Sequence, residues 1–192
     1  MVNFEKEAQP FSWLCLSLQE YGSLLVGGLV VLELIQHSTC LLYTSTGNTD
    51  LVDVELFSGD EVVRQIVACA HKTGVATVGS SHDFHQTPPE EEIVSRLERM
   101  ATLGCDIAKI AVMPQNPRDV LTLLSATERM HSEHPEVPII TMSMGQLGMV
   151  SRLCGEVFGS ALTFGAAGQA SAPGQAPVQK LRQVLNLFHG TE

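Results

Sequence analysis

Short apolar runs alternate with amphipathic segments from Asp50 to the end of the chain. The apolar runs are rich in β-branched residues and have the length of strands, whereas the segments between them repeat apolar positions at helical spacing. The runs that we predict as strands are Leu51–Phe57, Val75–Ser80, Ile107–Met113, Pro138–Met144 and Ala161–Gly165. This alternation is typical of parallel βα units and predicts an α/β fold.

Helix starts are marked by residues that favour the first turn of a helix. The signals are the capping-box pairs Ser58/Glu61 and Thr87/Glu90, the N-cap residue Asn116 before a proline, and Pro177. We interpret the acidic run Glu90–Glu92 as a solvated first turn that suits the helix dipole.

Residues 1–47 do not show this alternation of strand-like runs and amphipathic helical segments. Trp13–Leu18, Leu29–Ile35 and Cys40–Tyr43 have the composition of strands, but no amphipathic helix or capping box connects them. We therefore predict two parts, an N-terminal segment of unknown fold at 1–47 and a βα region at 48–192.

The composition and net charge argue against several classes of function. The chain has 192 residues, of which 44% are hydrophobic and 17% charged, so it can bury the core of a globular domain. Its formal net charge of −10 argues against nucleic acid or an anionic membrane as the partner. The most apolar stretch, Leu24–Ile35, contains Glu33 and is too short for a membrane span.

The five cysteines are odd in number and form no CxxC or Cys/His cluster at metal-ligand spacing. They predict a reduced cytoplasmic compartment, no disulfide framework and no metal site. No secretory signal is expected either.

A charged residue inside a buried parallel strand needs a reason, and Lys109 lies in the middle of one. Burial favours the neutral amine of a lysine, which is a nucleophile towards carbonyl groups. The alternatives are that Lys109 reaches solvent from a strand end, or that it pairs with Glu55. For Glu55 itself, a structural ion pair and a role in setting the protonation of Lys109 both stay open.

Three further groups follow predicted strands. His82 stands at the carboxyl end of a strand, where barrel enzymes keep catalytic groups, although a single histidine is often a loop residue. Arg152 could hold a carboxylate or lie on a helix surface. The polar turn Ser171–Gln175 offers hydroxyl and amide groups to a ligand.

Five collinear motifs together resemble type I 3-dehydroquinate dehydratase. They are Ser81–Pro88, Ala108–Pro114, Thr141–Met144, Ser151–Leu153 with Gly155–Ser160, and Ala170–Gln175. The resemblance covers about residues 48–192 and implies a (β/α)₈ barrel. It also implies conversion of 3-dehydroquinate to 3-dehydroshikimate in the shikimate pathway, with no metal and no organic cofactor.

The resemblance implies roles for individual residues. Lys109 would form an imine with the substrate ketone, and His82 would remove the neighbouring proton and later protonate the departing hydroxyl. The residues implied for substrate binding are Arg152 for the carboxylate, Ser171 and Gln175 for the closing loop, and Met142, Met144 and Phe164 for the apolar pocket wall.

The chain departs from the family at its N-terminus. The Glu-x-Arg and Phe-Arg motifs, and the glutamate that orients the catalytic histidine, are not recognisable in residues 1–47. We therefore expect only the last five βα units of the barrel, with two uncovered sheet edges and little dehydratase activity. A shifted reading frame or rearranged gene is our expectation for 1–47, with a divergent but functional start as the alternative.

Two other functions remain open. Lys109 would equally serve another Schiff-base barrel enzyme, such as a class I aldolase, and the missing early motifs favour a non-catalytic barrel remnant. The only partner that we predict is the small-molecule substrate, with a homodimer as an open alternative.

Overall fold

The computed structural model describes residues 13–18, 23–26, 29–33, 50–166 and 174–189. The strands are β1 Trp13–Leu18, β2 Ser23–Val26, β3 Leu29–Glu33, β4 Leu51–Glu55, β5 Ala76–Asp83, β6 Ile107–Val112, β7 Ile139–Ser143 and β8 Leu162–Ala166. The α-helices are α2 Asp60–Lys72, α3 Glu90–Thr102, α4 Pro117–Glu133, α5 Met149–Cys154 and α6 Val178–His189, with 3₁₀ turns η1 Leu56–Ser58 and η2 Gly155–Phe158.

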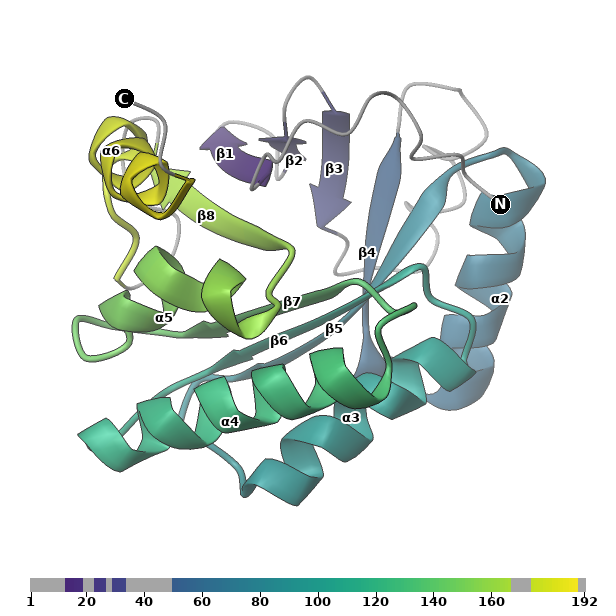
Figure 1. The fold of residues 1–192 in the computed structure, drawn as a ribbon. Helices are drawn as coiled ribbons and strands as arrows, with labels where there is room; N and C mark the ends of the chain where they lie inside the picture. Colours follow the sequence, from purple (N-terminus) through teal and green to yellow (C-terminus); the bar gives the residue numbers. More distant parts are fainter. Residues whose placement is uncertain (1–12, 19–22, 27–28, 34–49, 167–173, 190–192) are drawn as a thin grey trace.

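The strands form an eight-stranded sheet in the order β7-β6-β5-β4-β3-β2-β1-β8. Strands β3 to β7 run parallel, β8 runs parallel to β1, and β2 is antiparallel to both of its neighbours. The sheet curls until its two ends meet, where Ile139 of β7 bridges Ser160 beside β8 (Figure 1). The result is an α/β barrel in which β4 to β8 are each followed by a helix.

The five predicted strands and the helices between them are confirmed, with ends that differ by up to three residues. The N-cap prediction for Asn116 is also confirmed, since its side chain accepts a hydrogen bond from the Arg118 backbone. Both capping boxes are wrong. Ser58 belongs to η1, and the N-caps of α2 and α3 are Gly59 and Pro89, which make no side-chain cap bond.

The uncovered sheet edges that we expected are a further wrong prediction. Strand β3 pairs with β4, and β1 pairs with β8, so backbone hydrogen bonds cover both edges of the five-strand region. Of the three strand-like N-terminal segments, Trp13–Leu18 forms β1 and Leu29–Ile35 contains β3. Cys40–Tyr43 lies outside the described residues.

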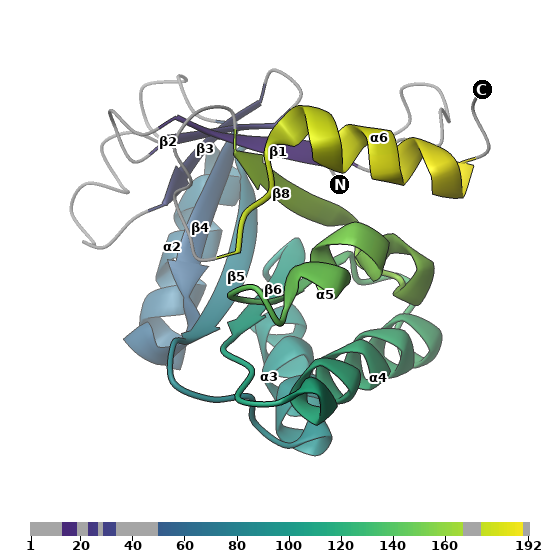
Figure 2. The same ribbon diagram turned by 90° about the vertical axis from the view of Figure 1, so that its left-hand side faces the viewer.

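The core is divided by the strands into two layers. Side chains on the outer face of β4 to β7, such as Val52 and Ile110, pack against α2, α3 and α4. The alternate side chains face inward and form a second cluster: Leu51, Ala76, Val78, Ala111, Ile140, Met142, Met144 and Phe164. Figure 2 shows the strands curving round this interior, with α6 outside β1 and β8. Side chains alternate between the two faces of each strand. Every second side chain therefore packs against the outer helices, and the side chains between them face the interior, where catalytic groups can lie.

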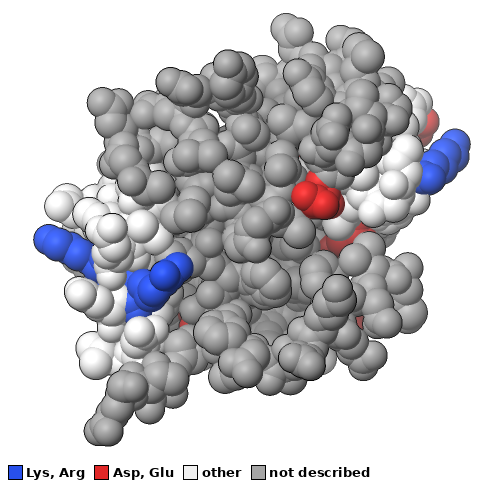
Figure 3. Space-filling model, turned by 90° about the horizontal axis from the view of Figure 1, so that it is seen from above, with Lys and Arg blue, Asp and Glu red and all other residues white. Residues whose placement is uncertain are grey.

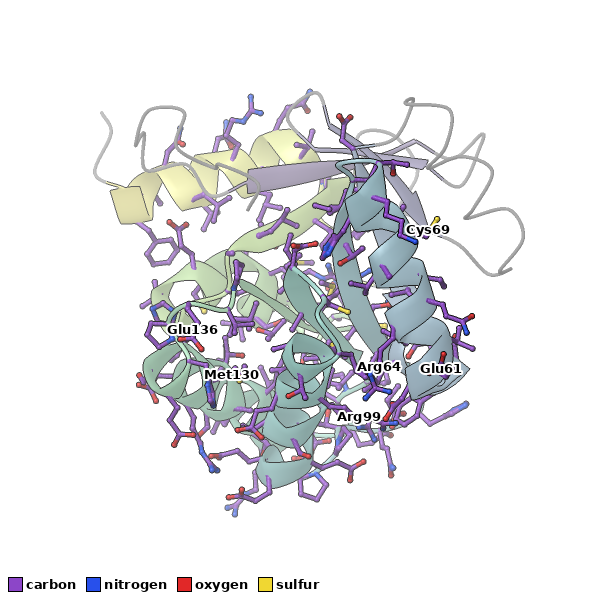
Figure 4. All side chains as sticks on the ribbon, turned by 90° about the vertical axis from the view of Figure 1, so that its right-hand side faces the viewer. Glu61, Arg64, Cys69, Arg99, Met130 and Glu136 are labelled. Carbon is purple, nitrogen blue, oxygen red and sulfur yellow. The ribbon has the colours of Figure 1, made fainter. Side chains whose placement is uncertain are left out.

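The outer helices carry the charged surface. Figure 4 looks onto α2 and α3, where Glu61 and Arg64 of α2 lie close to Arg99 of α3. Arg99 Nε donates to Asp60 Oδ1 at 3.0 Å. On the face seen in Figure 3, described basic side chains lie at the left and at the right, with a described acidic side chain between them, so they do not form one basic patch. Within the described ranges, no helix has the length and apolarity that crossing a membrane requires.

Asp106 ties α2 and β5 to the start of β6. Its Oδ2 atom accepts hydrogen bonds from the Thr77 backbone at 2.7 Å, the Thr77 hydroxyl at 2.9 Å and His71 Nε2 at 2.8 Å. Partial burial alone would raise the pKa of this carboxyl, but the bonds from His71 and Thr77 outweigh burial and lower the pKa below 3.8. The carboxylate therefore stabilises the fold above that pH.

We predict that Asp106→Ala lowers the free energy of unfolding by about 1 to 3 kcal/mol at neutral pH, because three donors lose their acceptor. The difference from the unaltered protein should shrink as the pH falls below about 4, because the unfolded state then takes up a proton on Asp106, and it should vanish only once the native carboxyl, whose pKa is lower, is protonated as well. Denaturant melts at two pH values measure both effects. Glu61→Ala, at an exposed acid on α2, is the control, and a loss as small as the control's would contradict the prediction.

Candidate active site

The carboxyl ends of the parallel strands bring four chemically active side chains together. Asp53 and Glu55 are two residues apart on β4, so they share the inward face of that strand. His82 is on β5, and Lys109 is on β6. Since β4, β5 and β6 are neighbours in the sheet, these side chains meet inside the barrel.

Lys109 is buried, as its mid-strand position predicted, and it faces the interior. Its Nζ lies 2.7 Å from Asp53 Oδ2, and the two side chains are only 6% and 5% exposed. The Phe164 ring lies beside Nζ, with its centroid at 5.4 Å. Both alternatives for Lys109 are wrong, because it neither reaches solvent nor pairs with Glu55. Asp53 and Lys109 stand on alternate strands, whose inward side chains share one layer of a barrel.

His82 lies near the end of β5, as predicted, and contacts Glu55. The distance between His82 Nδ1 and Glu55 Oε2 is 2.8 Å, and the histidine side chain is 22% exposed. The Phe84 ring stacks on the imidazole, with a centroid distance of 6.0 Å and an interplanar angle of 11°. Two contacts thus hold the ring at the mouth of the barrel.

Arg152 on α5 is 1% exposed, so its interpretation as a helix-surface residue is wrong. Its Nη1 atom lies 3.6 Å from the sulfur of Met142, which faces the barrel interior. Desolvation lowers the pKa of Arg152 to about 10, which still leaves the guanidinium charged at neutral pH. A buried positive charge beside the inner cluster suits an anionic ligand.

The predicted closing loop is described only in part. Ser171 lies outside the described residues, whereas Gln175 is half-buried at the start of the segment that leads into α6. Gly174, with φ at 78°, packs against the loop after β7, because a Cβ there would come within 2.2 Å of the Gly145 carbonyl oxygen. The loops after β7 and β8 therefore touch at the carboxyl end of the barrel.

The three apolar residues predicted for the pocket wall are buried in the inner cluster. Met142, Met144 and Phe164 are exposed by 6%, 2% and 8%. Met142 adjoins Arg152 and Phe164 adjoins Lys109, so two of the three border a charged group. Whether they touch a substrate stays a prediction.

Asp53 is the site residue that the sequence analysis missed. The pattern Asp53-Val54-Glu55 in a strand predicted to be buried places two acids on one face, so the signal that identified Glu55 applied equally to Asp53.

One group in the described part of the chain has ligand atoms close enough for a metal ion: Glu98, Glu133 and His134. It lies on α3 and at the end of α4, on the outside of the barrel, and does not include any of the strand residues described above.

The sequence model of the family described as type I 3-dehydroquinase matches residues 30–192. The chain belongs to the type I 3-dehydroquinase family. The match begins before residue 48, and the domain boundary that we placed there stays a prediction.

Two relatives in this family are named 3-dehydroquinate dehydratase. The one from Clostridioides difficile is 60% identical over 146 residues, and the one from Listeria monocytogenes is 55% identical over 173 residues.

The aligned regions cover 76% and 90% of this chain, and 57% and 66% of these two relatives. The chain thus spans less than two thirds of their length. A solved type I 3-dehydroquinate dehydratase from Clostridium difficile, with covalently modified comenic acid, is 51% identical with a TM-score of 0.78, covering 83% of this chain and 68% of that one. The enzyme from Geobacillus kaustophilus is 35% identical with a TM-score of 0.80, covering 84% and 68%. The barrel fold is therefore shared with type I dehydroquinases.

We predict that Asp53 and Lys109 are coupled in stability. Asp53→Leu or Lys109→Met alone removes one member of a buried charge pair and leaves the other buried, which costs about 3 to 5 kcal/mol. The double variant buries two apolar groups of similar size and should be much more stable than the sum of the single losses implies. Denaturant unfolding of the four proteins gives the coupling energy. Additive losses would show that the two side chains do not depend on one another.

Proposed function

We propose that this protein is a 3-dehydroquinate dehydratase, a hydro-lyase that converts 3-dehydroquinate to 3-dehydroshikimate without a metal or organic cofactor. The observation that carries the proposal is the buried amine of Lys109, held by Asp53 inside the barrel on the strand next to that of His82. The family, and the names of the relatives, support the same reaction.

In the first stage Lys109 forms an imine. The ammonium gives up a proton, for which Asp53 Oδ2 at 2.7 Å is a ready acceptor, and the neutral amine attacks the substrate ketone. Asp53 returns this proton to the carbonyl oxygen, which leaves as water, so that a protonated imine remains on Nζ and Asp53 is again a carboxylate. Since this group carries the same charge as the ammonium, Asp53 remains a counter-ion to it. The solved Clostridium difficile relative, which carries covalently modified comenic acid, supports covalent chemistry in this fold.

In the second stage His82 moves a proton twice. The protonated imine draws electrons from the adjacent carbon, so an imidazole is a strong enough base to remove a proton there. The resulting enamine expels the hydroxyl group one carbon further on, and His82 returns its proton so that water departs. Water then hydrolyses the imine, which releases the product and restores the lysine. One water molecule is lost from the substrate overall.

The side chains around Lys109 and His82 would bind the substrate. Arg152 would hold the substrate carboxylate, and its charged state at neutral pH supports that role. Gln175, with Ser171, would close over the substrate from the loop after β8. Met142, Met144 and Phe164 would exclude water from one side of the ring. These roles complete the proposed pocket.

Two other functions compete with this one. A class I aldolase-like enzyme would share Lys109 but would not need a base placed to eliminate water, so the Glu55–His82 pair favours the dehydratase. A non-catalytic remnant would not need to keep a buried Lys109–Asp53 pair, which is costly to desolvate. Low activity of this chain, a homodimer and a cytoplasmic location stay predictions from the sequence.

We predict that incubation with 3-dehydroquinate and borohydride leaves a reduced covalent adduct on the peptide that contains Lys109. Peptide mass spectrometry locates the modification. Lys72 and Lys180 are internal controls, because both lie on outer helices. An adduct on either of these, with Lys109 unmodified, would overturn the assignment.

We predict that Arg152→Lys raises KM, and that Arg152→Ala raises it further, because a lysine cannot reproduce bidentate contact with a carboxylate. A charged hydrogen-bonded pair is worth about 1.5 to 3 kcal/mol, or roughly ten- to a hundredfold in kcat/KM. Steady-state kinetics measure the change. The control is an analogue without the carboxylate, and if Arg152→Ala weakens binding of that analogue equally, Arg152 does not bind the carboxylate.

A further inference from the structure

Ser80 of β5 presents a hydroxyl group to the interior of the barrel. Side chains alternate along a strand, and Val78, two residues before Ser80, belongs to the inner cluster. Ser80 also pairs in register with Lys109, whose side chain faces inward. Only 1% of Ser80 is exposed, so its hydroxyl is almost fully removed from bulk water.

The hydroxyl groups on the opposite face of β5 have structural partners, whereas that of Ser80 does not. The Ser81 hydroxyl accepts a hydrogen bond from Arg96 Nη1 at 3.4 Å, and the Thr77 hydroxyl donates to Asp106 Oδ2 at 2.9 Å. Among the residues that the structure describes, none makes a hydrogen bond with the Ser80 hydroxyl. Since a buried hydroxyl normally has a partner, the donor of Ser80 is available to a molecule bound in the barrel.

The side chain of Lys109 crosses the strand that carries Ser80. Lys109 is on β6 and its Nζ reaches Asp53 on β4, with β5 between these two strands. On β5, the register partner of Lys109 is Ser80, and that of Asp53 is Val78. The lysine side chain therefore runs over the inward face of β5 at Val78 and Ser80, and Ser80 is the polar member of this pair.

Ser80 also lies between Lys109 and the acid/base group. The next inward residue of β5 towards the barrel mouth is His82, which contacts Glu55. A substrate that is bonded to Lys109 and reached by His82 must extend past Ser80. The carbon attacked by Lys109 Nζ, and the oxygen on that carbon, then lie at the depth of the Ser80 hydroxyl.

We propose that Ser80 is a catalytic residue of the imine stage: its hydroxyl donates a hydrogen bond to the ketone oxygen of the substrate while Lys109 attacks the carbonyl carbon. As the new N–C bond forms, an electron pair of the C=O bond moves onto this oxygen, which becomes a stronger acceptor. The oxygen then takes the proton that Asp53 returns and leaves as water. Ser80 keeps its own proton throughout, and it assists the reverse steps when water hydrolyses the imine. This inference rests on the proposed dehydratase function.

The test measures the rate of imine formation. The 192-residue chain is mixed with 3-dehydroquinate and quenched with borohydride at successive times, and mass spectrometry of the peptide with Lys109 gives the rate constant for adduct formation. We expect this rate constant to fall about tenfold in Ser80→Ala. The loss is smaller than the roughly hundred- to thousandfold effect of removing an oxyanion-hole donor, because Asp53 also protonates the oxygen. Ser80→Cys should lose as much, since a thiol fills the space of the hydroxyl but is a weak donor.

Ser81→Ala is the matched control, because it removes the neighbouring hydroxyl on the outward face of the same strand. Its rate constant should stay within about threefold of that of the unaltered chain. A second readout uses substrate with deuterium at the carbon from which His82 removes a proton. The isotope effect on kcat should be smaller in Ser80→Ala than in the unaltered chain, because slower imine formation then limits more of the turnover.

The outcomes separate this inference from the function on which it rests. Absence of the Lys109 adduct in the unaltered chain at every time would overturn the proposed function, and the role of Ser80 with it. An adduct that forms equally fast in Ser80→Ala and in the unaltered chain would overturn only the role of Ser80. An equal slowing in Ser81→Ala would show that the rate responds to the packing of β5, and an isotope effect that stays the same or grows would place Ser80 in the proton transfer; either result would also overturn the inference.

Discussion

The buried ion pair between Asp53 and Lys109 is the interaction on which the rest of the site depends. Two charges that are almost fully removed from water are expensive to desolvate, and their mutual attraction offsets part of that cost. The pair fixes Lys109 Nζ inside the barrel. It also requires β4 to present Asp53, and hence Glu55, on its inward face. A slip of β4 by one residue would turn both carboxylates outward and separate them from Lys109 and His82.

The register of strands β4, β5 and β6 sets the relative positions of these side chains. Glu55 of β4 pairs with Ser80 of β5, which pairs in turn with Lys109 of β6. His82 lies two residues beyond Ser80, on the same inward face and nearer the barrel mouth. Lys109 and His82 are therefore placed at successive depths by backbone hydrogen bonding. The outer packing of α2, α3 and α4 on the opposite face holds that register.

Strands β4 to β8 could be predicted from the sequence because buried parallel strands leave clear apolar runs. Lys109 could be identified because its charge interrupts such a run. Which acid of β4 it contacts could not be identified, because Asp53 and Glu55 share one face of that strand and β5 separates β4 from β6. Contact across the interior depends on curvature, which no local pattern reports. The burial of Arg152 was missed for a similar reason, since the short helix α5 gives too few residues to define a buried face.

The helix starts at Ser58 and Thr87 were predicted wrongly because other backbone features begin those helices. Gly59, with φ at 105°, turns the chain into α2, and consecutive prolines delay α3 until Glu90. Trp13–Leu18 and Leu29–Ile35 were identified as strand-like, but no fold was assigned to this region because its sequence pattern shows no helix between them. The antiparallel β2 explains this, since hairpin-connected strands need no crossover helix.

The central claim is that β4 positions one carboxylate for the nucleophile and another for the acid/base group. A crystal structure of the 192-residue chain, reduced with borohydride in the presence of 3-dehydroquinate, tests this claim most directly. The account predicts an adduct on Lys109 Nζ beside Asp53, with His82 bonded to Glu55 through Nδ1 and its Nε2 facing the carbon next to the former ketone. An adduct on Lys109 with His82 turned away from Glu55, or with Asp53 outside the barrel, would contradict it.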